Sequence, residues 1–180
     1  MPQIYIETPR LILRSWQTGD HEPFIELNRD KAVMQFFPAA MSPEETLRQV
    51  LRIRAHFEQY GYGFFALERK NSGQFIGFTG FSHPSFQSYF TPCVEIGWRL
   101  SREHWRQGFA TEAARACLQY GFVELGFEDI YSFTSVHNKA SEKVMIRAGM
   151  KKQDEFDHPA IQEGHFLRKH VLYKISASRT

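Results

Sequence analysis

The residues best suited to chemistry lie where a predicted strand turns through a glycine into a helix. Residues 94–100, VEIGWRL, alternate between two kinds of side chain with the two-residue period of a strand. The helix that follows opens between Gly108 and Thr111, and its first N–H groups have no partner within the helix. These N–H groups, with about half a positive charge from the helix dipole, favour a phosphate or pyrophosphate ligand. A tight strand-to-helix connection without a ligand would give the same pattern.

The composition of this turn narrows the kind of ligand. It contains neither the G-x-x-x-x-G-K-[ST] motif of nucleoside triphosphatases nor the G-x-G-x-x-G motif of dinucleotide-binding folds. Gly108 lets a bulky ligand approach the backbone. The helix also carries a face of small residues, which predicts close packing against a sheet. That face consists of Ala110, Ala113, Ala114, Cys117 and Gly121.

A second polar segment follows the next predicted strand, residues 130–136. It reads HNKAS at residues 137–141, and a short helix, expected from Ser141, ends at Gly149. Together, E-I-G-W-R-L, W-R-Q-G-F-A-T-E-A and N-K-A-S-x-K-V-x-x-x-A-G-M resemble the GCN5-related N-acetyltransferases (GNAT). Within this family the chain is similar to the branch that includes the ribosomal-protein N-terminal acetyltransferases. The motifs T-P-R-L-I-L-R at residues 8–14 and S-G-Q-F-I-G-F-T-G at residues 72–80 fit the same branch.

The resemblance covers nearly the whole chain and implies a single-domain α/β (α+β) fold. The expected sheet is mixed and largely antiparallel, is splayed between its two central strands, and has helices on both faces. The central strands are residues 94–100 and 130–136. The other predicted elements are strands at residues 10–16, 64–69, 74–82, 151–156 and 166–175, and helices beginning at Gly19-Asp20 and at Ser42, the second ending at Gly61.

By the same resemblance the cofactor is acetyl-CoA, with its pantetheine arm between the two central strands. Its pyrophosphate would lie on backbone amides of the turn, and Arg106 and Arg102 would add charge-assisted contacts. The residues expected to bind the cofactor are Trp98, Arg99, Leu100, Arg106, Gln107, Gly108, Phe109, Ala110, Thr111, Asn138 and Ser141. For Asn138 the open alternative is a cap on the following helix, and for the arginines it is a solvated surface position. No metal is expected.

The chain departs from the family pattern at two positions. Trp105 stands first in the loop, where the family usually has glutamine or arginine, so Arg106 is the expected charged contact to phosphate. Met145 stands where many members have a tyrosine that protonates the leaving thiolate. Because methionine has no proton to give, this role falls to Ser141 or to water.

Direct acetyl transfer needs a base for the amine, a donor for the developing oxyanion and a proton for the departing sulfur. Glu95 is the predicted base, because a carboxylate in a central strand is unfavourable unless it faces a wet cleft or a partner. An ion pair with Arg99, four residues along the same face, is the structural alternative, and His137 is the second candidate base. The oxyanion donor is expected among the backbone N–H groups of residues 97–99.

The expected acceptor is a primary amine. At pH 7 an α-amine of pKa about 7.9 is about one-tenth neutral, whereas a lysine-like amine near 10.4 is neutral in about one part in a few thousand. No finely tuned acid–base set is visible, which favours a protein or peptide N-terminus. A small amine, such as an amino acid, polyamine or antibiotic, and a non-catalytic acyl-CoA-binding module are the alternatives. Neither Cys93 nor Cys117 has an evident neighbouring base for an acetyl-enzyme.

Length and composition limit the class of protein. The 180 residues, 42% of them hydrophobic, predict one domain over residues 1–180 with a frayed tail at 176–180. A formal net charge of +2 and scattered basic residues argue against nucleic-acid binding. Two isolated cysteines argue against a disulfide framework and a zinc site. Without a leader or an apolar run approaching 18 residues, we expect a soluble cytoplasmic monomer or homodimer that binds no membrane.

Overall fold

The structure, a computed structural model, describes residues 2–177, which contain one eight-stranded sheet in the order β1-β2-β3-β4-β5-β6-β8-β7. The strands are β1 (Ile4–Glu7), β2 (Leu11–Arg14), β3 (Phe64–Arg69), β4 (Phe75–Ser82), β5 (Glu95–Leu100), β6 (Asp129–Ser135), β7 (Lys151–Asp157) and β8 (Lys169–Ser176). The helices are α1 (His21–Arg29), α2 (Pro43–Tyr60), α3 (Phe109–Val123) and α4 (Lys139–Arg147), with short 3-10 helices η1 (Thr18–Asp20) and η2 (Arg102–His104). Among these described helices, none has the length and apolar character needed to cross a membrane. Among the strands of residues 2–177, only β5 and β6 pair in parallel, so the prediction of a mixed, largely antiparallel α/β sheet is confirmed.

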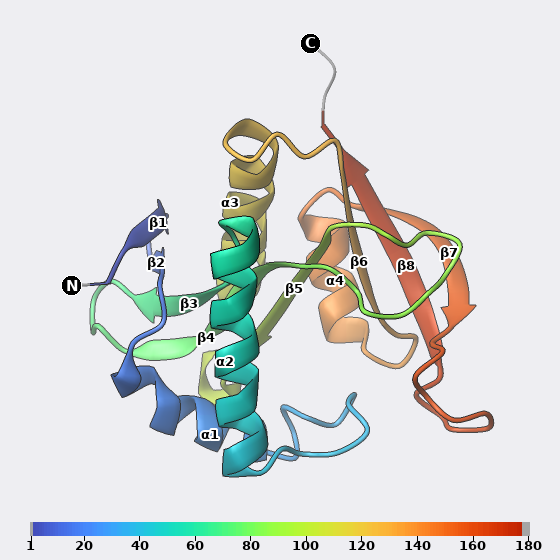
Figure 1. Ribbon diagram of the computed structural model, residues 1–180, viewed down its shortest axis with the longest axis horizontal. Coiled ribbons are helices and arrows are strands. Elements are labelled where there is room, and N and C mark those ends of the chain that lie inside the picture. The colour runs from blue at the N-terminus through green and yellow to red at the C-terminus, as the bar shows by residue number, and fades with distance from the viewer. Residues whose placement is uncertain (1, 178–180) are drawn as a thin grey trace.

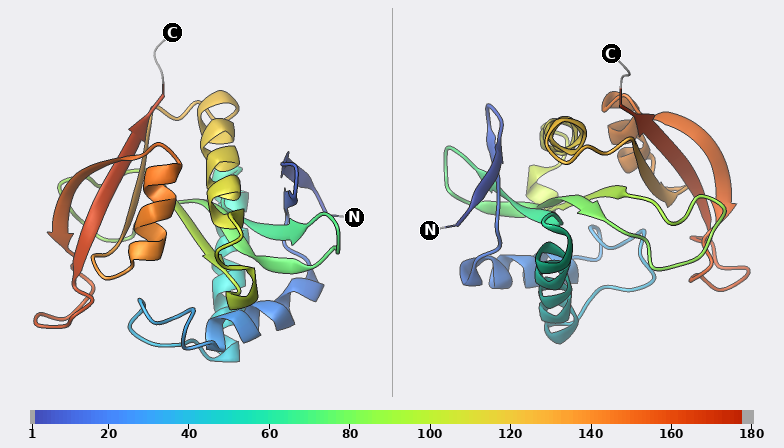
Figure 2. Two further views of the ribbon diagram at one scale, coloured as in Figure 1. Left: turned by 180° about the vertical axis from the view of Figure 1, so that it is seen from behind. Right: turned by 45° about the horizontal axis from the view of Figure 1, so that its top comes forward.

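The helices cover both faces of the sheet (Figure 1). Figure 2 shows α1 and α2 on one face and α3 and α4 on the other. The predicted small-residue side of α3 faces the sheet: Ala113 and Cys117 are fully buried, and a Cβ added to Gly121 would lie 2.8 Å from the ring of Phe81. On the other face, a second core surrounds Trp16 and Phe24. Close packing on the α3 face therefore depends on side chains that are small or absent.

Local chemistry sets both ends of α2 where the sequence predicts them. The Ser42 hydroxyl accepts a hydrogen bond from the Glu45 N–H at 3.2 Å, and the Ser42 N–H donates to the Glu45 carboxylate at 2.7 Å. This reciprocal capping box satisfies N–H groups that have no helical partner. Gly61 ends the helix at φ +77°, in the left-handed region that favours glycine.

The structure corrects the predicted start of the chain and of α4. The strand predicted at residues 10–16 is the shorter β2, and it pairs with β1, which the sequence pattern did not reveal. The last helix begins at Lys139 instead of Ser141, because Asn138 caps it. The predicted strand and helix are therefore correct in type and displaced at their ends.

The end of the chain is also corrected. The last strand begins at Lys169 instead of residue 166, because residues 158–168 run through turns. Ser176, predicted to belong to a frayed tail, is the final residue of β8. Ala177, the next residue of that predicted tail, donates its N–H to the Glu128 carbonyl at 2.8 Å, and residues 178–180 lie outside the described residues.

Arg14 is a buried cation whose charge is fully compensated. Its Nη1 and Nη2 each donate to the Asp20 carboxylate at 2.8 Å, and its Nε donates to Glu68 at 2.6 Å. Its side chain is only 4% exposed, and Asp20 is equally buried. The three residues join β2, η1 and β3, so this network fixes the start of α1 to the sheet.

Replacing Asp20 by asparagine should lower the free energy of unfolding by about 3 kcal/mol, because Arg14 would lose its bidentate partner while remaining buried. Urea denaturation at neutral pH measures the loss. The exposed pair of Arg29 and Glu26 provides the control, since Glu26→Gln should change stability by less than about 0.5 kcal/mol. Equal losses in the two variants would contradict the structural role of the buried network.

Candidate active site

The two central strands separate after a single point of pairing. In the described residues, β5 and β6 pair in parallel only at Glu95 and Tyr131. The Tyr131 N–H donates to the Val94 carbonyl at 2.9 Å, and the Ser132 hydroxyl donates to the Ile96 carbonyl at 2.9 Å. Beyond this closed end, β5 pairs with β4 and β6 pairs with β8. The predicted splay is therefore present, and it opens toward the carboxyl ends of both strands, where α3 and α4 begin.

The turn before α3 has a backbone shape suited to an anion. Arg106 and Gly108 both have positive φ, +59° and +84°, and they flank Gln107. The first helical hydrogen bond runs from the Glu112 N–H to the Gly108 carbonyl at 3.0 Å, so the preceding N–H groups have no helical partner. Alternation of this kind in a turn forms a concave set of N–H groups that binds anions. Ala110 and Thr111 continue this first turn of α3.

The side chains of Trp105, Phe109 and Arg106 surround this turn and differ in their exposure and contacts. The indole N–H of Trp105 donates to the Leu100 carbonyl at 2.8 Å, so Trp105 ties the turn to the end of β5. Phe109 is buried in the core, which leaves only its backbone available to a ligand. The side chain of Arg106 is exposed, as a contact to a solvent-facing phosphate requires.

Arg10 supports the turn from the other end of the chain, and no sequence pattern singled it out. Its Nη1 donates to the Gln107 carbonyl at 2.9 Å, and its Nε donates to the Glu112 carboxylate at 2.6 Å. Thr8 donates to the same carboxylate at 2.6 Å, and the Arg10 guanidinium lies 4.4 Å from the centre of the Phe109 ring. The turn between β1 and β2 therefore clamps the first turn of α3. Beside the clamp lies a groove of about 650 Å³ that also includes Arg115 and Arg147.

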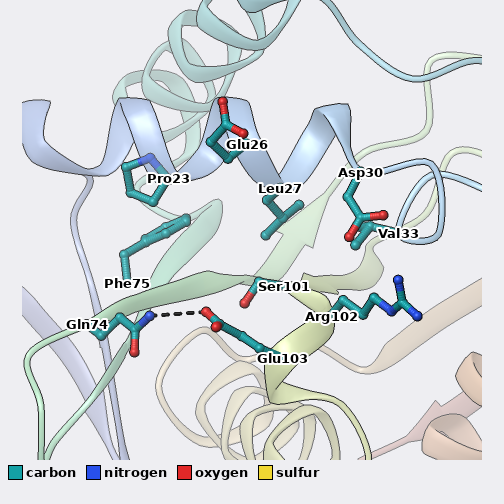
Figure 3. A pocket seen from close by; sticks show the side chains of 10 residues that line it. All are labelled: Pro23, Glu26, Leu27, Asp30, Val33, Gln74, Phe75, Ser101, Arg102 and Glu103. Carbon is teal, nitrogen blue, oxygen red and sulfur yellow. Dashed lines mark hydrogen bonds between the residues drawn. The ribbon is translucent and has the colours of Figure 1, made fainter.

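A second groove, of about 700 Å³, lies between α1 and the start of β4 (Figure 3). Its wall includes Arg102, Glu103 and Gln74, and the Gln74 amide donates to the Glu103 carboxylate at 3.1 Å. Leu27 and Phe75 form part of its apolar side. The structure therefore places Arg102 on this groove, on the α1 side, and its predicted phosphate contact stays a prediction.

Glu95 lies on the face of the sheet that α1 and α2 cover. Gly97, two residues along, shares this face, and a Cβ added there would lie 3.2 Å from the Phe64 ring and 4.0 Å from Glu95 Oε1. The Phe64 ring packs on Phe78, which belongs to the core beneath α1 and α2. Glu95 is thus at the closed end of the splay, beside the strand segment predicted to supply the oxyanion donor.

The carboxylate of Glu95 has little compensation. Burial raises its pKa to about 8, and a 3.3 Å hydrogen bond from the Ser82 hydroxyl only partly opposes this increase. Among residues 2–177 it forms no ion pair with Arg99, so the structural alternative is wrong. A carboxyl group whose pKa lies near neutral pH is suited to general-base catalysis.

Asn138 and Ser141 lie together at the start of α4. The Asn138 side-chain oxygen accepts from the Ser141 N–H at 3.2 Å, and its amide donates to Thr134 at 3.0 Å and to the Ser141 hydroxyl at 3.1 Å. Asn138 is therefore the helix cap, as its alternative interpretation proposed. The Ser141 hydroxyl is an acceptor in this network, which leaves its own hydrogen available for donation.

The remaining candidates are less well placed for proton transfer. His137 lies in the turn after β6, beyond Ser135, which is itself about 13 Å along the strand from Tyr131 at the closed end. Met145 is 1% exposed and belongs to the core. The nearby Tyr173 hydroxyl donates to Glu142 at 3.0 Å, and burial, with that carboxylate, raises the Tyr173 pKa to about 12.

The described residues also bear on thiol and metal chemistry. Burial and the neighbouring Glu95 raise the pKa of Cys93 to about 11, and burial raises that of Cys117 further. Both thiols therefore stay protonated at neutral pH, which disfavours an acetyl-enzyme. Within residues 2–177, no group of three or more His, Cys, Asp or Glu side chains is arranged to hold a metal ion.

Comparison with known proteins places this architecture in a family. The protein-family model described as "Acetyltransferase (GNAT) domain" matches residues 10–151. The Bacillus subtilis protein YkkB is 33% identical over 144 residues, which cover 79% of this chain and 83% of YkkB. A GNAT-family acetyltransferase from Bacillus anthracis has a crystal structure with TM-score 0.78 and 26% identity, covering 98% of each chain. RimL, a ribosomal L7/L12 α-N-protein acetyltransferase, shares the fold with TM-score 0.80 and 17% identity, over 98% of this chain and 96% of RimL. The chain therefore belongs to the GNAT acetyltransferase family and is an N-acetyltransferase.

Proposed function

We propose that this enzyme transfers the acetyl group of acetyl-CoA to the α-amine of a protein or peptide N-terminus, by direct attack in a ternary complex. The observation that carries the proposal is Glu95, a carboxyl group of raised pKa at the closed end of the splay that has no counter-charge within residues 2–177. An α-amine is partly neutral at pH 7, so one carboxylate acting through water suffices as its base. RimL, named as an α-N-protein acetyltransferase, supports this acceptor class and the ribosomal-protein branch.

The residues of the turn and of the splay fit coenzyme A. The GNAT family uses acetyl-CoA, and RimL has been solved in complex with coenzyme A. In this chain the two positive-φ residues of the turn support binding of the diphosphate by the backbone of residues 107–111, with Arg106 adding charge. Along the pantetheine arm we place the backbone of Trp98, Arg99 and Leu100 in β5, and the start of α4.

Each predicted group then has one step in the reaction. Glu95 takes the proton of the amine, directly or through water, as the nitrogen attacks the thioester carbonyl carbon. Within residues 97–99, the N–H of Trp98 points away from β4 toward the splay, and it donates to the carbonyl oxygen as it gains charge. When the carbon–sulfur bond breaks, the Ser141 hydroxyl donates its hydrogen to the sulfur. Glu95 lies on the α1–α2 face and Ser141 begins α4 on the opposite face, which supports the splay as the place where base and acid would act on one thioester.

A thiol-release assay with acetyl-CoA tests the acceptor class. The panel contains amidated peptides with free N-termini, the same peptides with blocked N-termini, free amino acids, polyamines and aminoglycosides. Thiol should be released from acetyl-CoA fastest with peptides that have free N-termini, and the blocked peptides should give no release. A small amine more than tenfold faster than every peptide would replace the proposed acceptor. Calorimetric binding of CoA without thiol release from any amine would contradict the proposed reaction.

A further inference from the structure

Arg99 is a half-buried cation that, unlike Arg14, has no counter-anion in the described part of the chain. Arg14 has carboxylates on both sides of its guanidinium, at 2.6 and 2.8 Å. Within residues 2–177, no carboxylate forms an ion pair with Arg99. Burial lowers its pKa to about 10, so the group remains charged at neutral pH. An uncompensated cation in such surroundings is unfavourable unless a ligand supplies the missing anion.

The residues around Arg99 hold its guanidinium in place, but they neither neutralise its charge nor accept all of its hydrogen bonds. Nη1 donates to the Asn28 side-chain oxygen at 2.6 Å and lies 3.9 Å from the Met41 sulfur. The group stacks on Phe37, 4.2 Å from the ring centre, and lies 5.4 Å from that of Phe78. Nε is buried and has no hydrogen-bond partner among the residues that the structure describes. A planar guanidinium fixed by stacking, with donors left over, is prepared to bind a carboxylate.

Arg99 shares its face of β5 with the proposed base. Glu95, Gly97 and Arg99 are every second residue of β5, so their side chains point to the same face, and the four positions from Glu95 to Arg99 span about 13 Å. Between the two charges lie Gly97, which has no side chain, and the edge of the Phe64 ring. An acceptor lying along this face would meet a proton acceptor, an apolar stretch and then a cation.

We infer that Arg99 recognises an acidic side chain near the N-terminus of the acceptor, an inference that rests on the proposed function. Its ligand is the carboxylate of an Asp or Glu at the second or third position of an extended peptide whose α-amine lies beside Glu95. Two residues of extended chain cover about 7 Å, and the side chain adds the rest of the span. The amine and carboxylate of one free amino acid are too close together to reach both groups.

Peptide pairs that differ only in charge test this inference. Amidated hexapeptides carry Asp or Asn at position 2 or 3, with alanine or serine first, and thiol release gives kcat/KM for each. The better-placed Asp peptide should exceed its Asn partner at least tenfold, and the ratio should fall as salt is added. In Arg99→Gln the ratio should fall to within twofold of one. If Arg99→Gln does not fold, Arg99→Lys takes its place in the test. This variant keeps the charge but loses the planar guanidinium, so its ratio should lie between the wild-type value and one.

Lys31→Gln is the matched control, because Lys31 is an exposed cation in the connection after α1 that carries Phe37. This variant should keep the wild-type ratio. Equal rates for Asp and Asn peptides in the wild type, or a ratio unchanged in both Arg99 variants, would overturn the inference and leave the proposed function standing. Faster turnover of free aspartate or glutamate than of any peptide would overturn the peptide assignment. Silence with every amine would overturn the inference and the proposed function together.

Discussion

Replacing Glu95 by glutamine should lower kcat about 100-fold or more while the affinity for CoA stays within about twofold. General-base catalysis contributes about 10² to 10⁴ in rate, and glutamine preserves the size of the side chain and can still accept the Ser82 hydrogen bond. Steady-state thiol release gives kcat, and calorimetry gives the CoA affinity. The control is Glu58→Gln, which removes an exposed carboxylate from α2 and should change neither quantity. Wild-type rates at every pH in Glu95→Gln would remove Glu95 from the mechanism.

The raised pKa of Glu95 gives the rate and the stability opposite pH dependences. Because the base must be ionised, the wild-type rate should rise with pH and level off above about 8. The folded-state pKa lies above the unfolded value of about 4.3, so the folded chain binds the proton more tightly. Wild type and Glu95→Gln should therefore be equally stable near pH 4, and the wild type should lose stability as pH rises toward 8. The difference should reach a few kcal/mol, and urea denaturation at pH 5 and pH 8.5 measures it.

Elements defined by local signals were predictable from the sequence. The capping box at Ser42 and the stop at Gly61 place α2 to the residue, because both ends depend only on neighbouring residues. In contrast, β1 has four residues, and it is a strand because it pairs with β2. Asn138 could cap α4 only where Thr134 and Ser141 met its side chain, so the start of that helix depended on contacts as well as on pattern.

The candidate site divides in the same way. The turn at Gly108 and the carboxylate Glu95 are visible in sequence, because each lies in one contiguous strand–turn–helix segment. The alternative interpretation of Glu95, an ion pair with Arg99, was wrong because positions four apart in a strand are about 13 Å apart, too far for a salt bridge. The Arg10–Glu112 clamp joins residues 102 positions apart. Such partners come together only through the sheet, and no spacing rule in the sequence reveals them.

Replacing Gly108 by valine should weaken CoA binding at least tenfold and leave the fold intact. At φ +84° a β-branched residue is strained by about 1 to 2 kcal/mol, and its Cβ would lie 3.3 Å from the Arg10 guanidinium. Relaxing that strain changes the turn that presents the N–H groups of residues 107–111, and the side chain covers the backbone that the diphosphate approaches. Calorimetric titration with CoA measures the affinity, and urea denaturation confirms the folded state.

Gly61→Val separates strain from binding. Gly61 has a similar φ, +77°, no heavy atom lies within 4 Å of a Cβ added there, and it ends α2 instead of beginning α3. Both variants should lose similar stability, because both force a β-branched residue into the left-handed region. Only Gly108→Val should lose CoA affinity, because only that residue lies in the proposed phosphate turn. Unchanged affinity in Gly108→Val, or an equal loss in Gly61→Val, would contradict binding of the diphosphate at the start of α3.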